Sequence, residues 1–266
     1  MDFDKLFEKY LRNWMKKNTQ FTPDEAEDML PELYEEWVTS PCKEIGGITP
    51  EQYFLNITDP KELVEELIRE NEGDSNACSL LGDRICEVPQ CAPYIIDIIK
   101  KGENEKLVVE CMNLLDDMGA EQPLDIYVQF IANENAPEGI RETACEILKT
   151  NANEVKDSLF PLILGASEDL KEILGDILCL ADRDERTFNL LRDLFLNGKN
   201  VPFAAGLIAK YGDERAASYL YPALDVCNYL EFIEIRNAIE SLGGVVDDNI
   251  RDWSDDEFYK ALKGIK

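Results

Sequence analysis

The chain has 266 residues, 45% of them hydrophobic, so it is long enough to bury a large core. It carries 27 Lys and Arg residues against 55 Asp and Glu residues, a formal net charge of −28. Such a charge repels polyanions, so we expect neither nucleic acid nor an anionic membrane as a partner. A basic protein or a basic peptide fits this charge better.

The sequence contains no histidine. This excludes histidine acid–base chemistry, Ser-His and Cys-His nucleophile pairs, and histidine metal ligands. Phosphate-binding glycine loops, dinucleotide fingerprints and EF-hand calcium loops are also missing from the sequence. The acidic segments at residues 247–249 and 252–257 lack the spacing and the central glycine of a calcium loop. We therefore expect no enzyme activity, no cofactor and no metal, although catalysis by carboxylate, Lys or Tyr side chains stays open.

Eight cysteines are spread along the chain, most of them within apolar helical patterns, where cysteine behaves as a small hydrophobic residue. Cys78, Cys86 and Cys91 have the spacing C-x7-C-x4-C, which is not a standard zinc pattern. Buried core thiols are the simpler interpretation, and a role beyond packing stays open. We see no signal peptide and no apolar run of the about 20 residues that span a membrane. We therefore expect a cytoplasmic protein with reduced thiols.

The first segments predict short helices. Apolar residues within 3–15 recur with i, i+3, i+4, i+7 spacing, which indicates an amphipathic helix. Thr22 and Pro23 predict the N-cap and first residue of a second helix. Pro31 lies inside the apolar pattern of that helix and should kink or split it.

Residues 37–54 contain the phrase W-x-x-S-P-x-x-E-I-G-G-x-T-P-x-x-Y-F. The pair Gly46-Gly47 predicts a turn, and Thr49 with Gln52 predicts a capping box that begins a helix. The phrase resembles an LGG-x-TP segment found in several bacterial small helical domains, a resemblance that implies no particular chemistry. We interpret this segment as a tight corner between two helices.

From residue 60 onward the pattern becomes periodic. Five expected helix ends follow one another at steps of 32, 30, 31 and 31 residues: Gly119, Asn151, Ala181, Gly212 and Gly243. Gly and Asn tolerate the left-handed conformation that often ends a helix. Each end is preceded by an apolar position: Leu114, Ile147, Ile177, Ile208 and Ile239. Small residues stand three or four positions earlier, at Cys111, Ala144 and Ala205, and would let neighbouring helices approach.

Two of the expected first helices contain an internal proline, Pro161 and Pro222, which should remove a backbone bond and bend the helix. With the Ile-Arg-Glu-Thr-Ala run at residues 140–144, this pattern resembles the HEAT repeat. The short period and the Gly212-Asp213 ending are similar to the HEAT-like repeats named after phycobilisome lyases. The resemblance covers residues 60–244, or about six units if each is one helix pair.

This resemblance implies an all-α fold, a right-handed α-α superhelix in which paired antiparallel helices form a solenoid. We expect a helical cap with the GG-x-TP corner at residues 1–59, repeats at 60–244 and a capping helix at 245–266. The last helix should begin at residues 254–257, with an apolar side that comprises Phe258, Tyr259, Leu262 and Ile265. The alternative is a non-repeating helical bundle.

In HEAT-type solenoids the second helices line the concave face. The resemblance therefore implies a groove that gathers the carboxylates of Glu110, Asp116, Asp117, Glu142, Glu146, Asp176, Glu234 and Glu240. A groove lined by one sign of charge attracts the opposite charge, whereas the alternative is a generic solvated acidic face. Tyr211 and Tyr221 could add aromatic contacts or form edges of the core.

The favoured function is a non-catalytic protein-binding scaffold whose acidic concave face engages a basic protein or peptide. The alternative is a HEAT-like lyase or chaperone that holds a small ligand or chromophore, although no cysteine has an obvious activating base. Some HEAT-like proteins are DNA glycosylases, but the charge of −28 argues against a nucleic-acid groove. We expect a monomer or a weak homo-oligomer, and the partner's identity and the biological process stay open.

Overall fold

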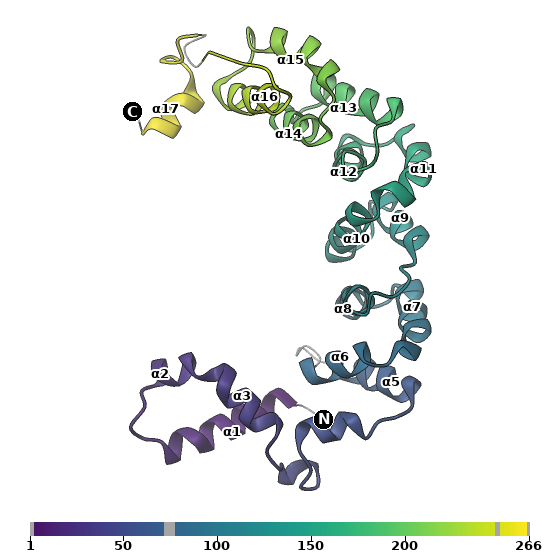
Figure 1. Ribbon diagram of the computed structural model, residues 1–266, viewed down its shortest axis with the longest axis vertical. Helices are drawn as coiled ribbons and strands as arrows, with labels where there is room; N and C mark the ends of the chain where they lie inside the picture. Colours follow the sequence, from purple (N-terminus) through teal and green to yellow (C-terminus); the bar gives the residue numbers. More distant parts are fainter. Residues whose placement is uncertain (1–2, 72–77, 248–250, 265–266) are drawn as a thin grey trace. The chain divides into compact units, whose positions relative to one another are not determined.

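The computed structural model describes residues 3–71, 78–247 and 251–264, and every regular element in that part of the chain is a helix. The all-α prediction is therefore confirmed. Contacts divide the chain into two units, residues 1–123 and 124–266, with the boundary inside the expected repeat region (Figure 1). The expected division into two caps and a repeat region stays a prediction. None of the described helices is long and apolar enough to cross a membrane.

Unit 1 contains eight α-helices in its described part. Their bounds are α1 Phe3–Lys17, α2 Pro23–Asp28, α3 Leu30–Val38, α4 Pro50–Leu55, α5 Pro60–Glu70, α6 Ser79–Cys86, α7 Ala92–Lys101 and α8 Glu105–Asp117. Two short 3-10 helices complete it, η1 Lys43–Ile45 and η2 Pro89–Cys91. Helix α1 packs on α3, α5 pairs with α6, and α7 pairs with α8. Contacts from α4 to α6 and from α6 to α8 form a row of alternate helices.

The expected helix starts of unit 1 are confirmed. Thr22 caps α2 and Thr49 caps α4, each through a capping box with the residue three positions later. Each box satisfies two backbone N–H groups that have no partner within the helix. Met29 separates α2 from α3, so Pro31 lies in the first turn of a new helix, where proline is tolerated.

The corner between α3 and α4 is also present. Gly46 and Gly47 have φ angles of +84° and +85°, a left-handed conformation that favours glycine. The backbone N–H of Cys42 donates to the carbonyl of Ile48 at 2.9 Å and closes the turn. The segment thus acts as a rigid helix–helix corner, in agreement with the interpretation of its sequence.

Aromatic side chains form the core around this corner. Phe3 lies 4.7 Å from Phe54 and Phe7 lies 5.1 Å from Trp37, measured between ring centroids. Phe54 is 1% exposed and Trp37 is 3% exposed. Helix α2 buries none of its six residues and α4 only two of its six, so large rings are prominent in the core of this part of the unit.

Unit 2 contains the remaining helices. Their bounds are α9 Leu124–Ala132, α10 Glu138–Thr150, α11 Ala152–Ile163, α12 Glu168–Leu178, α13 Glu185–Asn197, α14 Val201–Tyr211, η3 Glu214–Ala216, α15 Ala217–Ala223, α16 Tyr229–Ser241 and α17 Glu257–Lys263. Helices pack in sequential pairs, α9 with α10, α11 with α12, α13 with α14 and α15 with α16. The second members α10, α12, α14 and α16 also contact one another in a row.

The positions that the periodic pattern marks as core are buried. The five apolar positions before the helix ends are at most 6% exposed: Leu114, Ile147, Ile177, Ile208 and Ile239. The small residues Cys111, Ala144 and Ala205 are fully buried. The period of the sequence therefore marks the buried faces of the second helices correctly.

The predicted left-handed helix ends are confirmed only at the glycines. Gly119, Gly212 and Gly243 have φ angles of +57°, +73° and +84°. The prediction is wrong at Asn151, whose φ is −111°, because this residue ends α10 and immediately begins α11. Ala181 was expected only as a helix end, and α12 ends three residues before it, at Leu178.

Two further expectations are only partly met. Pro161 and Pro222 do lie inside helices, but in the last turns of α11 and α15, so these helices end soon afterwards. At the C-terminus, Asp256 caps α17, whose Tyr259 ring packs 4.9 Å from that of Tyr229. Two other residues expected on the apolar side of this helix, Phe258 and Leu262, are not buried but 47% and 61% exposed. Ile265, also expected there, lies outside the described residues.

Candidate functional site

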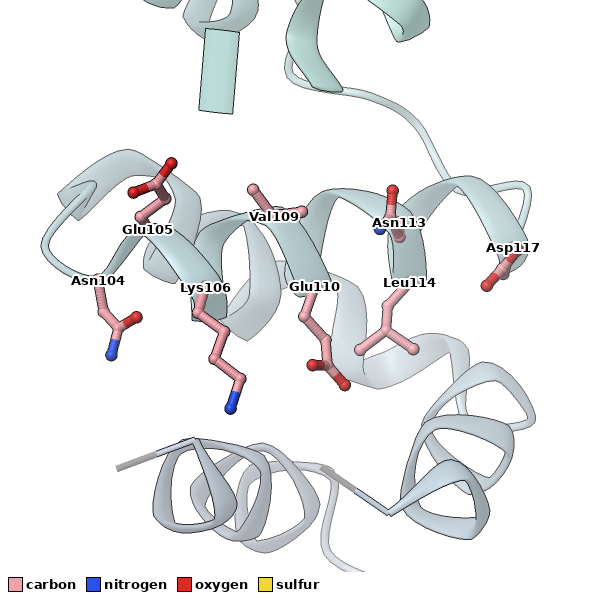
Figure 2. A pocket seen from close by; sticks show the side chains of 8 residues that line it. All are labelled: Asn104, Glu105, Lys106, Val109, Glu110, Asn113, Leu114 and Asp117. Atoms are coloured by element: carbon pink, nitrogen blue, oxygen red, sulfur yellow. The ribbon is translucent and has the colours of Figure 1, made fainter. Parts of the chain in front are cut away.

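A groove of about 770 Å³ runs along α8 in unit 1 (Figure 2). Asn104 begins the helix, because its side-chain oxygen accepts a hydrogen bond from the backbone N–H of Leu107 at 3.1 Å. One face of α8 is buried and the helix packs against α6 and α7, so its polar residues are left on the opposite face. The groove is lined by Asn104, Glu105, Lys106, Val109, Glu110, Asn113, Leu114 and Asp117.

Negative charge exceeds positive charge in this groove. Its carboxylates belong to Glu105, Glu110 and Asp117, and its one cationic side chain among the lining residues is that of Lys106. Lys106 and Glu110 lie one turn apart and point to the same side of the helix (Figure 2). The arrangement can therefore accept a further cation beside Glu110 or Asp117.

The carboxyl group of Glu110 is half-buried. Burial raises its pKa above the usual value, and the charge of Lys106 and a hydrogen bond from Asn71 oppose this effect. A second cation in the groove would favour the ionised form of Glu110 and lower this pKa again.

Of the eight carboxylates expected at a binding face, Glu110 and Asp117 line this groove. Asp116 is exposed on the same helix but is not among the lining residues. The expected carboxylates of unit 2 lie on three helices, with Glu142 and Glu146 on α10, Asp176 on α12, and Glu234 and Glu240 on α16.

Lysines lie among the expected carboxylates on the second helices of unit 2. Asp176 on α12 lies 2.5 Å from the ammonium nitrogen of Lys149 on α10 and 3.4 Å from that of Lys210 on α14. Lys149 also pairs with Glu146 at 2.8 Å. Burial lowers the pKa of Lys149, but its bonds to the two carboxylates outweigh burial and raise the pKa overall. The surroundings of Asp176 therefore do not carry charge of one sign.

The remaining expected carboxylates of unit 2 are more accessible. Glu142 is exposed and Glu234 is half-buried, and neither forms an ion pair within the described part of the chain. Glu240 lies 3.7 Å from the guanidinium of Arg236, one turn before it on α16. Of the expected site residues, the structure thus brings Glu110 together with Asp117, and Glu146 together with Asp176.

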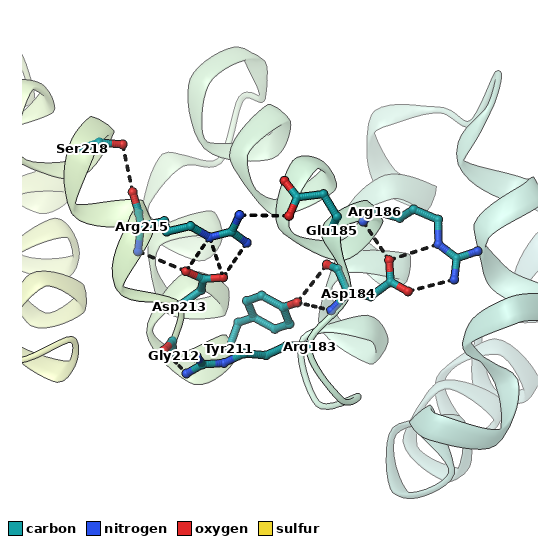
Figure 3. A network of polar contacts seen from close by, with 9 residues as sticks. All are labelled: Arg183, Asp184, Glu185, Arg186, Tyr211, Gly212, Asp213, Arg215 and Ser218. Atoms are coloured by element: carbon teal, nitrogen blue, oxygen red, sulfur yellow. Dashed lines mark hydrogen bonds and ion pairs between the residues drawn. The ribbon is translucent and has the colours of Figure 1, made fainter.

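Two Asp-Glu-Arg triplets in unit 2 form the same polar arrangement 29 residues apart in sequence (Figure 3). Asp184 and Asp213 each cap the following helical segment by accepting a bond from the backbone N–H of the triplet's arginine, at 2.8 Å and 3.0 Å. The guanidinium of that arginine, Arg186 or Arg215, donates back to the same carboxylate. Each triplet therefore holds its own arginine in one orientation.

Each oriented arginine reaches back to the preceding helix pair. Arg186 pairs with Asp157 at 2.9 Å, and Arg215 pairs with Glu185 at 2.9 Å. The guanidinium carbons also lie over phenylalanine rings of those earlier helices, 3.7 Å and 4.1 Å from the ring centroids. These contacts join successive helix pairs, and we assign them a structural role.

Tyr211 belongs to the same network. Its hydroxyl donates to the carbonyl of Asp184 at 2.9 Å and accepts from the N–H of Asp184 at 2.7 Å (Figure 3). The buried ring thus forms an edge of the core, one of the two interpretations of its sequence position. Tyr221 exchanges similar bonds with the backbone of Val245. Sequence reasoning missed the network, although the repeated Asp-Glu-Arg triplet was its visible signal.

All eight cysteines are free thiols. Cys78 and Cys91 are buried and Cys86 is half-buried, and burial raises the pKa of Cys78 and of Cys91 to about 11. Among the described residues, no group of three or more Cys, Asp or Glu side chains is arranged to hold a metal ion. These thiols are therefore protonated near neutral pH, as in packed cores.

Comparison of the chain with protein-family models, with curated proteins and with solved structures found no match.

Proposed function

We propose that this chain is a non-catalytic scaffold, built as a HEAT-like solenoid, whose acidic face binds a basic protein or peptide. The sequential helix pairs, the row of second helices in each unit and the repeated Asp-Glu-Arg contacts support the solenoid. Stacked repeats bury a continuous core and leave an extended surface, which suits the recognition of another chain.

The observation that carries the proposal is the α8 groove. It combines three carboxylates with one lysine, and Glu110 is half-buried, where an added charge pair is less screened than in open solvent. Asn104 and Asn113 add amide groups that can accept hydrogen bonds from a lysine or arginine side chain. A basic side chain laid along α8 would meet Glu110 and Asp117.

A titration tests this assignment. A fluorescently labelled peptide rich in Lys and Arg is mixed with the wild-type chain and with the Glu110→Gln/Asp117→Asn variant, and fluorescence anisotropy reports binding. Each partly exposed charge pair contributes up to about 1 kcal/mol, so we expect the variant to bind about five to thirty times more weakly. Added salt should weaken binding to the wild-type chain.

The matched control removes the same number of charges from unit 1 outside the groove lining. Glu103 and Glu121 are exposed, lie outside the lining residues and form no ion pair within the described part of unit 1. The Glu103→Gln/Glu121→Gln variant should bind like the wild-type chain. If both variants weaken binding equally, general acidity rather than the α8 groove attracts the peptide. If neither variant changes binding, the groove has no role.

An apolar pocket in unit 2 favours a second candidate function, the non-covalent holding of a small apolar ligand. This pocket of about 460 Å³ lies among α13, α14, α15 and α16, with Phe195, Tyr219 and Ile235 in its lining. Cys227 also lines it, but burial raises the pKa of this thiol, which does not suit a nucleophile. Ala223→Trp would fill the pocket and should abolish uptake of a neutral apolar dye, whereas unchanged uptake would contradict this candidate.

A further inference from the structure

Helix α1 carries the opposite charge to the chain as a whole. Residues 3–18 hold five Lys or Arg and two Asp or Glu, although the chain has a net charge of −28. This helix forms one wall of a pocket of about 630 Å³, and α3, the residues after it and η1 form the other. The pocket lies wholly within unit 1 and is distinct from the α8 groove.

Aromatic and aliphatic side chains form the walls of this pocket. Trp14 and Tyr10 are half-buried on α1, and Leu6 lies one turn before Tyr10. Trp37 lines it from α3 and is 3% exposed, so it forms part of the floor. The Trp14 ring packs 5.4 Å from that of Phe21, which restrains its position. Such walls suit a planar or branched apolar group.

Three ammonium groups stand beside these walls. Lys9 forms an ion pair with Glu44. Lys17 and Lys43 line the same pocket but form no ion pair within residues 3–71, 78–247 and 251–264. Asn13 adds an amide that can donate hydrogen bonds. Two cations without a carboxylate partner are thus placed next to apolar walls.

Nearby carboxylates limit the number of negative charges that a ligand of this pocket can carry. Glu36 and Glu44 line the same pocket, and residues 24–36 contain seven Asp or Glu and no Lys or Arg. A polyanion such as nucleic acid would bring further negative charges against this acidic segment. A compact anion with one carboxylate meets less repulsion, because it brings a single negative charge near Glu36 and Glu44.

We propose that the pocket between α1, α3 and η1 binds a compact organic carboxylate attached to an aromatic or aliphatic body, either free or as the C-terminal residue of a peptide. The carboxylate pairs with Lys17 and Lys43, and the apolar body packs against Trp14 and Tyr10. This site is independent of the α8 groove and uses the opposite charge.

Two matched pairs of probes test the site by isothermal titration calorimetry on the full chain. N-acetylphenylalanine is compared with its uncharged amide, and Gly-Gly-Phe is compared with its C-terminal amide. We expect each acid to bind at least about tenfold more tightly than its amide, because the amide cannot form the charge pair. Tighter binding of the tripeptide acid assigns the site to peptide C-termini, and tighter binding of the single residue assigns it to free acids.

Variants then locate the binding. Lys17→Ala/Lys43→Ala should weaken binding of both acids about tenfold or more and leave the amides unaffected. Lys16→Ala/Lys101→Ala removes two exposed lysines of unit 1 that lie outside the pocket, so it should leave binding unchanged. Added salt should release the acids from the wild-type chain, which tests the charge pair without any substitution.

Three results would overturn the proposal: equal binding of acid and amide, an unchanged affinity in the Lys17/Lys43 variant, or no binding of either acid at millimolar concentration. Binding of the basic peptide should be the same in the Lys17/Lys43 variant and the wild-type chain. The two sites can therefore fail separately, because each has its own probe and its own variant.

Discussion

The corner region of unit 1, from α1 to α4, and the helix pairs of unit 2 are held together differently. Seven rings of the corner region form one contact network: Phe3, Phe7, Tyr10, Tyr34, Trp37, Tyr53 and Phe54. Unit 2 buries mostly aliphatic and small side chains along its second helices and repeats one polar contact between its helix pairs. We therefore expect stability to depend on a few large side chains in the first region and on many smaller ones in the second.

The difference follows from helix length. Helix α2 buries none of its six residues and α4 buries only Pro50 and Phe54 of its six, so large rings fill the space. In unit 2, helices such as α10, α13 and α16 have thirteen residues and bury at least four each. A region with few core positions should be more sensitive to the loss of any one of them.

The largest expected effect therefore lies in the corner region. Trp37→Ala should lower the free energy of unfolding of this region by about 3–5 kcal/mol, because it removes a large buried ring and leaves a cavity. Hydrogen exchange should rise in α1, α3 and α4 and stay unchanged in unit 2. If exchange in the corner region stays at the wild-type level, the aromatic network is not what holds it together.

A pair of glycine variants tests the packing of unit 2. A Cβ at Gly175 in α12 would lie 2.8 Å from Cδ1 of Leu194 and 3.1 Å from Cδ1 of Leu207. A Cβ at Gly206 in α14 meets nothing within 4 Å. The gain in helix propensity is the same for both, so Gly175→Ala should be about 1–3 kcal/mol less stable than Gly206→Ala in thermal unfolding. Equal stability would mean that α12 and its neighbours are loosely packed.

The smallest effect is expected for the repeated polar contact. Arg215→Ala removes the bonds to Asp213 and Glu185 and should lower the unfolding midpoint only slightly, since the guanidinium is exposed and solvent screens its ion pairs. Arg192→Ala is the control, because Arg192 is exposed and forms no ion pair in the described part of unit 2. Chemical unfolding, followed by circular dichroism, measures the stability of both variants. An equal loss of stability in the two would show that the repeated contact does not stabilise unit 2.

The repeated contact between aspartate and arginine should also affect how the stability of the fold depends on pH. The bond from Arg186 lowers the pKa of Asp184 to about 2 from the usual 3.8, and the bond from Arg215 lowers the pKa of Asp213. A carboxyl whose pKa is lower in the folded state stabilises the fold above its unfolded pKa, and this contribution is lost as the pH falls through the folded value. Arg215→Ala removes the bond that lowers the pKa of Asp213, so this variant should lose less stability than the wild-type chain as the pH falls below the usual carboxyl pKa of 3.8.

Local features of the fold could be predicted because each depends on a few neighbouring residues. The capping boxes at Thr22 and Thr49 and the break before Pro31 involve groups at most three positions apart. The left-handed end at Gly212 needs only the absence of a Cβ. Asn151 differs because the next helix begins at once, which depends on how α11 packs rather than on the tolerance of Asn for that conformation.

The candidate site was predicted less well, because the pattern of charged residues in a sequence does not show which acidic and basic side chains lie close together in the fold. Glu110 and Asp117 were expected at a binding face and do line a groove. Asp176 was expected there as well, but Lys149 and Lys210 reach it from neighbouring helices. The pocket of Lys17 and Lys43 was missed, since it forms only where α1 packs beside α3 and η1.

By itself, the sequence determined that this protein is all-helical, where helices α2 and α4 begin, and which apolar and small residues of the second helices are buried. Those properties follow from hydrophobic period and from caps, which act over one or two turns of chain. Only the tertiary structure decided which charges are paired with one another within the described part of the chain. Arg186 and Asp157 are 29 residues apart, and their contact exists only because packing brings two helix pairs together.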